Sequence, residues 1–224
     1  MNTTKIAFGV GNAQIELMLT RRLALATAAL FPFSLSAHAA LDVRSPQDQA
    51  DISRVEAYLN GLRTLKAQFY QVAPDGGISQ GTAWVDRPGK MRFQYDPPAP
   101  FLLVAAHGVL TFNDSSLQQT TNVPLSRTPL GILLAENVAL SGNVTVTAIQ
   151  RLPGQLQMTL VRTDSPGDGS LTLIFTDQPL ALRQWVVVDA QRRETHVTLT
   201  NIALGGRFDP ALFEQLAPPA ARKG

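Results

Sequence analysis

The sequence predicts a mainly β protein of the α+β class, with one antiparallel sheet and a few short helices. From Thr64 onward apolar residues largely alternate with polar ones, as in half-buried strands. Short turns rich in Gly, Pro and Asp separate these runs, and helical periodicity occurs in few places. Consecutive strands joined by short turns form an antiparallel meander. We therefore expect a single long meander that curls, with two apolar helices filling its concave face.

Residues 1–40 are typical of an export signal rather than of the folded domain. Arg21 and Arg22 precede an apolar run of about thirteen residues, Leu23 to Leu35, and Ala37-His38-Ala39 is a small-residue cleavage motif. The run is shorter than the roughly 20 apolar residues that span a bilayer. The segment therefore predicts a signal peptide and not a membrane anchor.

Cleavage near Ala39 or Ala40 would leave one mature domain over residues 41–224, which we expect in the periplasm. Translation from Met18 is an alternative, because the residues before it fit no part of the signal pattern. The paired arginines leave both the Sec and the twin-arginine export routes open. The sequence contains no cysteine, so we expect neither a disulfide nor a cysteine to acylate in the mature chain.

Composition favours a folded core and argues against nucleic-acid binding. Hydrophobic residues make up 45% of the chain and charged residues 16%, which supports a sizeable core. The net charge of +2 comes from residues 1–40, so the remaining basic and acidic residues balance. Phosphate backbones require a surplus of Lys and Arg. We therefore expect no nucleic-acid partner. We also expect a monomer.

The first element after the signal is a helix that begins near Ser45-Pro46 or Asp48 and ends near Gly61. One apolar stripe follows the helical spacing of three and four residues: Ile52, Val55, Leu59 and Leu62.

Six strands should follow this helix: Thr64–Tyr70, Ile78–Asp86, Lys90–Tyr95, Phe101–Ala106, Val109–Asn113 and Leu117–Val123. The hairpin signal Asp75-Gly76-Gly77 separates the first two, and Arg87-Pro88-Gly89 separates the next two. In the third strand Met91, Phe93 and Tyr95 share one face, which predicts either an ordinary packed core or the wall of an apolar cavity.

The pattern then breaks at a short apolar helix, with Thr128 as the N-cap and Pro129 in the first turn. Strands resume afterwards: Asn143–Gln150, Gln155–Thr163, Ser170–Thr176, Ala181–Val188 and Glu194–Ala203. The Asp-rich turn at 164–169 is interpreted as a plain turn, because the ligand pattern of a calcium-binding loop is absent. A single capped turn, 209–213, precedes a proline-rich tail.

Residues able to carry catalysis or bind a metal are scarce. The mature chain has two histidines, His107 and His196, and no cysteine, so a His/Cys metal site is excluded. No nucleophile elbow and no phosphate-binding glycine loop occurs. We therefore expect no enzyme activity, no metal and no cofactor.

Three motifs, taken in order, carry a resemblance to a known family. They are W-V-x-R-P-G-x-M-R-F-x-Y-x-x-P from Trp84, T-P-L-x-x-L-L from Thr128, and F-x-x-L-x-P-P from Phe213. The early helix and the Leu65-Lys66-Ala67-Gln68-Phe69 strand also fit. The mature chain resembles the LolA family, the periplasmic carriers of outer-membrane lipoproteins. The middle segment departs from the family pattern, because Ala106-His107-Gly108 stands where the family has an Asp-Gly motif.

The resemblance implies an incomplete antiparallel barrel of about 10–11 strands closed by a helical lid, with an apolar cavity for acyl chains. Arg87 occupies the family's R-P position, which implies a latch that bonds to the lid and holds it shut. The implied cavity residues are Phe69, Trp84, Met91, Phe93 and Tyr95. The implied lid residues are Leu130, Ile132, Leu133 and Leu134 from the short helix and Ile52, Val55 and Leu59 from the first helix.

The implied function is carriage of lipoproteins by their acyl chains from the inner to the outer membrane. The implied partners are lipoproteins, an inner-membrane lipoprotein-releasing ABC transporter and, if present, an outer-membrane receptor. Two alternatives stay open. One is a periplasmic module of the same fold that binds other lipids or senses lipoproteins. The other is an envelope assembly protein whose apolar face docks a partner strand or helix.

Overall fold

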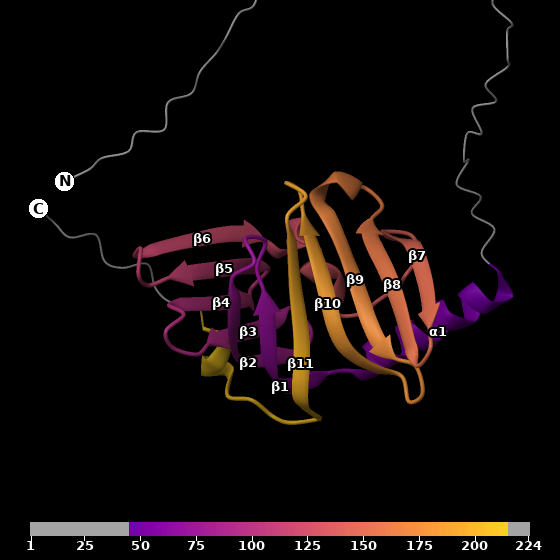
Figure 1. Ribbon diagram of the computed structural model, residues 1–224, viewed down its shortest axis with the longest axis horizontal. Coiled ribbons are helices and arrows are strands. Elements are labelled where there is room, and N and C mark those ends of the chain that lie inside the picture. The colour runs from indigo at the N-terminus through magenta and orange to yellow at the C-terminus, as the bar shows by residue number, and fades with distance from the viewer. Residues whose placement is uncertain (1–44, 215–224) are drawn as a thin grey trace, which may run out of the picture. The chain divides into compact units, whose positions relative to one another are not determined.

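The computed structural model describes residues 45–214, which form one antiparallel sheet of eleven strands with short helices (Figure 1). The sheet is open, and the mainly β, α+β class predicted from the alternation is confirmed. The predicted signal peptide, its cleavage site, the alternative start at Met18 and the tail after Glu214 lie outside the described residues.

The elements, in chain order, are α1 (Pro46–Gly61), β1 (Thr64–Val72), β2 (Ile78–Asp86), β3 (Lys90–Tyr95), β4 (Phe101–Ala106), β5 (Val109–Asp114), β6 (Gln119–Pro124), η1 (Leu125–Arg127), α2 (Leu130–Leu133), β7 (Val144–Leu152), β8 (Gln155–Arg162), η2 (Pro166–Asp168), β9 (Gly169–Thr176), β10 (Ala181–Asp189), β11 (Glu194–Leu204) and η3 (Pro210–Phe213). The predicted strands match these within a few residues.

The strand order differs from the predicted single meander. Strands β1 to β6 form one meander and β7 to β11 form another, and the two are joined through β1 and β11. In that pair Phe69 lies opposite Leu199 and Val72 opposite His196. Strands β6 and β7 therefore lie at the two edges of the sheet. The chain between them, from η1 to Ser141, is too long for a hairpin turn and carries α2.

Helix α1 begins where its local sequence satisfies the first backbone N–H groups. The Ser45 hydroxyl accepts a hydrogen bond from the Asp48 amide, and the Asp48 carboxylate accepts one from the Ser45 amide, each at 3.1 Å. This reciprocal pair is a capping box, and Pro46 occupies the first turn. The predicted apolar stripe is confirmed, since Ile52, Val55 and Leu59 are all buried.

The sheet curls around one large core on its concave face. In Figure 1 strands β4 to β6 lie across the direction of β8 to β11, and α1 crosses the β7–β10 part of the sheet. The apolar sides of both meanders, α1 and α2 all contribute to this core. The two helices therefore fill the concave face, as predicted from the sequence.

A second, smaller cluster lies on the convex face and is covered by η3. Val104, Ala106 and Phe213 are its buried members, and Trp84 packs against them. The Asp209 carboxylate caps the η3 turn by accepting from the Ala211 amide at 2.9 Å, as the sequence predicted. The end of the described chain is thus packed on the opposite face from α1 and α2.

None of the helices within residues 45–214 combines the length and the apolar character needed to cross a membrane.

Candidate functional site

The floor of the concave face is a set of aromatic and apolar side chains from β1 and β3. Phe69, Met91, Phe93 and Tyr95 are each no more than 7% exposed. The Phe69 ring lies 4.6 Å from the Phe93 ring and 5.0 Å from the Tyr95 ring, between centroids. Trp185 of β10 continues the set, with its ring 5.9 Å from that of Phe93. The structure therefore brings together four of the five predicted cavity residues, and adds Trp185.

Trp84 is the exception, which corrects its assignment to the cavity. Its neighbours in β2, Ala83 and Val85, are buried in the concave core, so alternation turns Trp84 to the convex face. There it is half-buried, and the Lys66 ammonium lies 5.7 Å from the centre of its ring. Trp84 therefore takes no part in the floor.

The short helix α2 and the turn before it cover this floor. Leu130, Ile132, Leu133 and Leu134 are each at most 9% exposed and belong to the same core cluster as Phe93. The predicted N-cap is wrong by one residue: the cap position is Pro129, and the Thr128 hydroxyl donates back to the Leu125 carbonyl at 2.9 Å. The leucine and isoleucine side chains of η1 and α2 thus form a compact plug at the place where the lid is predicted.

Arg87, in the turn between β2 and β3, joins this lid to α1. Its Nε and Nη2 donate to the Ala135 carbonyl at 3.1 and 2.5 Å. Its Nη1 donates to the carbonyls of Leu59 and, at 3.1 Å, Leu62 at the end of α1. The amide of Gly89, two residues on, donates to the Leu134 carbonyl at 2.9 Å. One turn of the sheet therefore holds both helices.

The Arg87 guanidinium is buried without a carboxylate beside it in the described structure. The side chain is 4% exposed, and its acceptors are backbone carbonyls. Burial, and secondly the positive charge of Arg63, lower the pKa of Arg87 from its ordinary value. A buried charge is costly unless it is well hydrogen-bonded, and here backbone carbonyls at the end of α1 and just after α2 supply these bonds.

Tyr95 places one polar group at the edge of the apolar floor. Its hydroxyl donates to the Gln71 side-chain oxygen at 2.9 Å. Burial raises the pKa of Tyr95 to about 12, so the phenol is neutral at physiological pH. The floor therefore presents no negative charge at this position.

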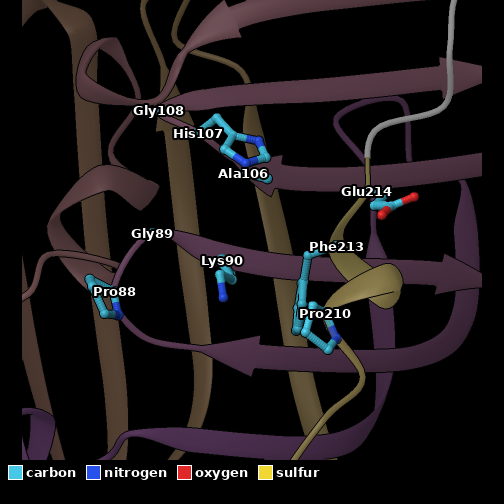
Figure 2. Close-up of a pocket in the computed structure, with 9 residues that line it drawn as sticks. All are labelled: Pro88, Gly89, Lys90, Ala106, His107, Gly108, Pro210, Phe213 and Glu214. Atoms are coloured by element: carbon cyan, nitrogen blue, oxygen red, sulfur yellow. The ribbon is translucent and has the colours of Figure 1, made fainter.

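The described structure has a pocket of about 480 Å³, but it lies away from the floor. Figure 2 shows it bounded by the β2–β3 turn, the β4–β5 turn and η3, with Lys90, His107 and Phe213 among the residues at its sides. The Lys90 ammonium lies 5.9 Å from the centre of the Phe213 ring. Phe69, Met91, Phe93 and Tyr95 do not line it, because they face the packed concave core, and Trp84 does not line it either.

The polar residues that hold the chain after α2 were not identified from the sequence. Asn60 and Glu56 of α1 bond to the backbone of Val138 and Leu140. In the sequence they occupy the polar side of an amphipathic helix, where a side chain with a structural partner cannot be told from one in solvent. Within residues 45–214 no group of three or more His, Cys, Asp or Glu side chains is placed to hold a metal ion.

Fold and site together define an open-sheet β protein with an apolar, covered concave face. The family model described as "Outer membrane lipoprotein carrier protein LolA" matches residues 60–215. The chain therefore belongs to the LolA family, which confirms the resemblance carried by the three motifs. Proteins of this family are carriers and not enzymes, so the expectation of no enzyme activity holds for this chain.

Curated relatives carry the same description. An outer-membrane lipoprotein carrier protein from Methylococcus capsulatus is 31% identical over 177 residues, or 75% of this chain and 84% of that protein. One from Pseudomonas syringae pv. syringae is 26% identical over 210 residues, or 89% and 96%. Among solved structures, a LolA superfamily protein from Nitrosomonas europaea aligns over 73% of this chain and 97% of its own, with 9% identity and a TM-score of 0.42.

Proposed function

We propose that this protein binds the acyl chains of lipoproteins on its concave face and carries them through the periplasm from the inner to the outer membrane. Membership of the LolA family and the carrier names of its relatives support the lipoprotein-carrying role. The acyl-binding site and the route of transfer are inferences from the geometry of the floor, the lid and Arg87.

The observation that carries the proposal is an apolar floor covered by a small, separately attached plug. An acyl chain in water costs about 0.8 kcal/mol per CH₂ group, so a carrier must enclose it. Phe69, Phe93 and Trp185 offer a large apolar surface for this purpose. In the closed protein the leucines of α2 cover that surface, so acyl chains and lid side chains would compete for the same place.

Because acyl chains and lid side chains compete for the same floor, replacing one by the other changes the free energy little. Each buried Leu or Ile side chain of the lid is stabilised by roughly 1.5–3 kcal/mol relative to its exposed state. Acyl chains that replace them on the floor recover similar burial there, and lid side chains can pack against the cargo. Arg87 then favours the closed form indirectly, because its bonds hold Ala135, the residue at the base of the lid, beside the end of α1. Loading and release need only shift this balance by a few kcal/mol.

The proposed partners follow from the same role. We propose that an inner-membrane lipoprotein-releasing ABC transporter supplies the cargo and that an outer-membrane receptor, where one exists, accepts it. The proposed location is the periplasm, which residues 1–40 indicate by their signal pattern.

A direct test is to isolate the protein from the periplasm and identify the molecules that copurify by mass spectrometry. Lipoproteins with acylated N-termini are the expected cargo, and Phe93→Glu should lose them, because a carboxylate in the floor would have to be buried. Trp84→Ala is the matched control, since Trp84 faces the other way. Copurification of free lipids without lipoproteins would favour the lipid-binding alternative and contradict lipoprotein carriage.

A further inference from the structure

The chain that follows α2 crosses the core without secondary structure of its own. We call residues Ala135–Leu140 the strap. Its Val138 and Leu140 side chains are 4% and 0% exposed, yet the strap contains neither helix nor strand. Buried backbone groups need partners, and here side chains from other elements provide several of them.

Two of these partners come from α1. Asn60 bonds to both backbone groups of Val138: its Nδ2 donates to the carbonyl and its Oδ1 accepts from the amide, each at 2.9 Å. The Glu56 carboxylate accepts from the Leu140 amide at 2.6 Å. An amide side chain used as donor and acceptor at once holds the strap much as a neighbouring strand would.

Helix α1 is itself fastened to the far half of the sheet. Arg151 of β7 pairs with Asp48 at 2.5 Å and Asp51 at 2.7 Å. Arg54 pairs with Asp177, in the β9–β10 turn, at 2.8 Å. The Leu182 amide of β10 donates to the Tyr58 hydroxyl at 3.0 Å. A helix with polar attachments to β7, β10 and the turn before β10, and a buried apolar face, is a fixed part of the fold.

The lid itself, residues 126–134, is attached differently. Its backbone hydrogen bonds are mostly local, such as those from Gly131 to Thr128 and from Leu134 to Leu130. The Gly89 amide, donating to Leu134, ties its end to the sheet, and the Leu125 amide just before it donates to the Gly108 carbonyl at 2.8 Å. Apolar packing supplies the rest. Apolar contacts and one backbone bond at each end leave the lid few polar attachments, whereas the bonds from Asn60 and Glu56 are specific to the strap.

We propose that Asn60 and Glu56 are positioning residues that keep the strap in place while the lid moves, so that the lid swings on a stationary strap and α1 stays on the sheet. This rests on the proposed function, because the motion serves cargo exchange. It divides the residues expected to close the cavity into a moving part, Leu130–Leu134, and a fixed part, the α1 residues Ile52, Val55 and Leu59.

Amide hydrogen exchange on the protein without cargo tests this first. In the wild type the amides of Val138 and Leu140 should exchange more slowly than that of Ile132, which belongs to the moving part. Asn60→Ala should speed exchange at Val138 by about fivefold, since a lost hydrogen bond costs on the order of 1 kcal/mol. Asn60→Asp keeps the acceptor and should have a smaller effect there. Equal rates at Val138 and Ile132 in the wild type would overturn the proposal.

Variants at Glu56, with a control substitution at Ser53, complete the hydrogen-exchange test. Glu56→Gln keeps an acceptor oxygen and should leave Leu140 protected, whereas Glu56→Ala should expose it to exchange. Ser53→Ala is the matched control on the same helix, because the Ser53 hydroxyl bonds only within α1, to the Gln49 carbonyl. If the Leu140 amide exchanges at the same rate in Glu56→Ala as in Ser53→Ala, Glu56 has no positioning role.

Spin-label distances with cargo test the motion itself. The chain contains no cysteine, so labels at introduced cysteines are unambiguous. The exposed positions Ala57 on α1, Ala139 on the strap and Arg127 in the lid are suitable. With a peptide carrying fatty-acyl chains on its N-terminal residue, the 57–127 distance should change while the 57–139 distance stays constant.

The outcomes separate the two proposals. A change in the 57–139 distance together with 57–127 would show that strap and lid move as one body, and would overturn the stationary strap. Failure of the acylated peptide to bind at all, measured in the same sample, would overturn the proposed function, while the exchange experiment still decides whether Asn60 and Glu56 hold the strap. In the double variant Asn60→Ala/Glu56→Ala, the acylated peptide should dissociate at least about tenfold faster than from the wild type.

Discussion

The Arg87 guanidinium donates twice to the carbonyl oxygen of Ala135, from Nε at 3.1 Å and from Nη2 at 2.5 Å. Ala135 is the residue at which the lid ends and the strap begins. The opposite side of the same guanidinium reaches the Leu59 and Leu62 carbonyls at the end of α1. A single planar group therefore fixes the start of the strap relative to a helix, which the shorter point charge of a lysine cannot do with the same geometry.

Replacing Arg87 by Leu should loosen the lid and leave the sheet folded. The carbonyls of Leu62 and Ala135 would lose charged donors, which should lower the free energy of unfolding by about 1–3 kcal/mol. Amide exchange at residues 130–134 should rise, and cargo should load and leave more easily. Thermal melts and exchange measured on the same sample check this, and Arg87→Lys should restore the wild-type behaviour only in part.

Arg63→Leu is the control for Arg87→Leu, because it removes the same charge from an exposed neighbour. Arg63 makes one long bond, from Nη1 to the Glu136 carbonyl at 3.4 Å. The Arg63→Leu substitution should therefore leave the amide exchange rates of the lid close to those of the wild type. Equal effects of the two substitutions would show that net charge, and not the bonds of Arg87, governs the lid.

Gly131→Ala should disturb the closed lid. A Cβ atom at this position would lie 2.6 Å from the Leu125 carbonyl oxygen, a distance that forces η1 and α2 apart. Gly61→Ala is the matched control, since nothing lies within 4 Å of a Cβ there. Exchange at Ile132 should increase in Gly131→Ala and stay unchanged in Gly61→Ala. An unchanged lid in both would show that the contact between η1 and α2 is dispensable.

The stability of the protein should fall at alkaline pH partly through Tyr95. Burial raises the pKa of Tyr95 to about 12, whereas tyrosine in the unfolded chain titrates near pH 10. A folded-state pKa above the unfolded value contributes stability that is fully present below about pH 10 and is lost as the pH rises towards 12. Tyr95→Phe should flatten the decline in unfolding free energy across this window. A decline as steep as in the wild type would place the responsible group elsewhere.

Most of the strand boundaries could be predicted because local chemistry determines them. The run Lys90–Tyr95 alternates strictly, and Gly and Pro residues mark the turn before it. The start of α1 was likewise predictable, because Ser45, Pro46 and Asp48 form a local capping motif. Arg87 stood out through the family resemblance, and in the structure its guanidinium donates to the carbonyl of Ala135, just after α2.

The features that could not be predicted depend on contacts between distant residues. The pairing of β1 with β11 places Leu65 opposite Leu204, and no local pattern indicates which strands join the two meanders into one sheet. Trp84 was assigned to the wrong face when the family resemblance was followed, although the alternation of Ala83 and Val85 already placed it opposite. The strap lacks periodicity, so its anchors Asn60 and Glu56 could not be recognised.

Tryptophan quenching by brominated acyl chains tests most directly where the cargo binds. The protein has two tryptophans, and they lie on opposite faces: Trp185 packs against Phe93 in the concave core, and Trp84 packs beside Phe213 on the convex face. Each can be studied alone, in Trp84→Phe and Trp185→Phe. With a peptide acylated by brominated fatty acids, Trp185 should be quenched and Trp84 should not. Quenching of Trp84 with Trp185 unaffected would place the acyl chains on the convex face and contradict the proposed carrier site.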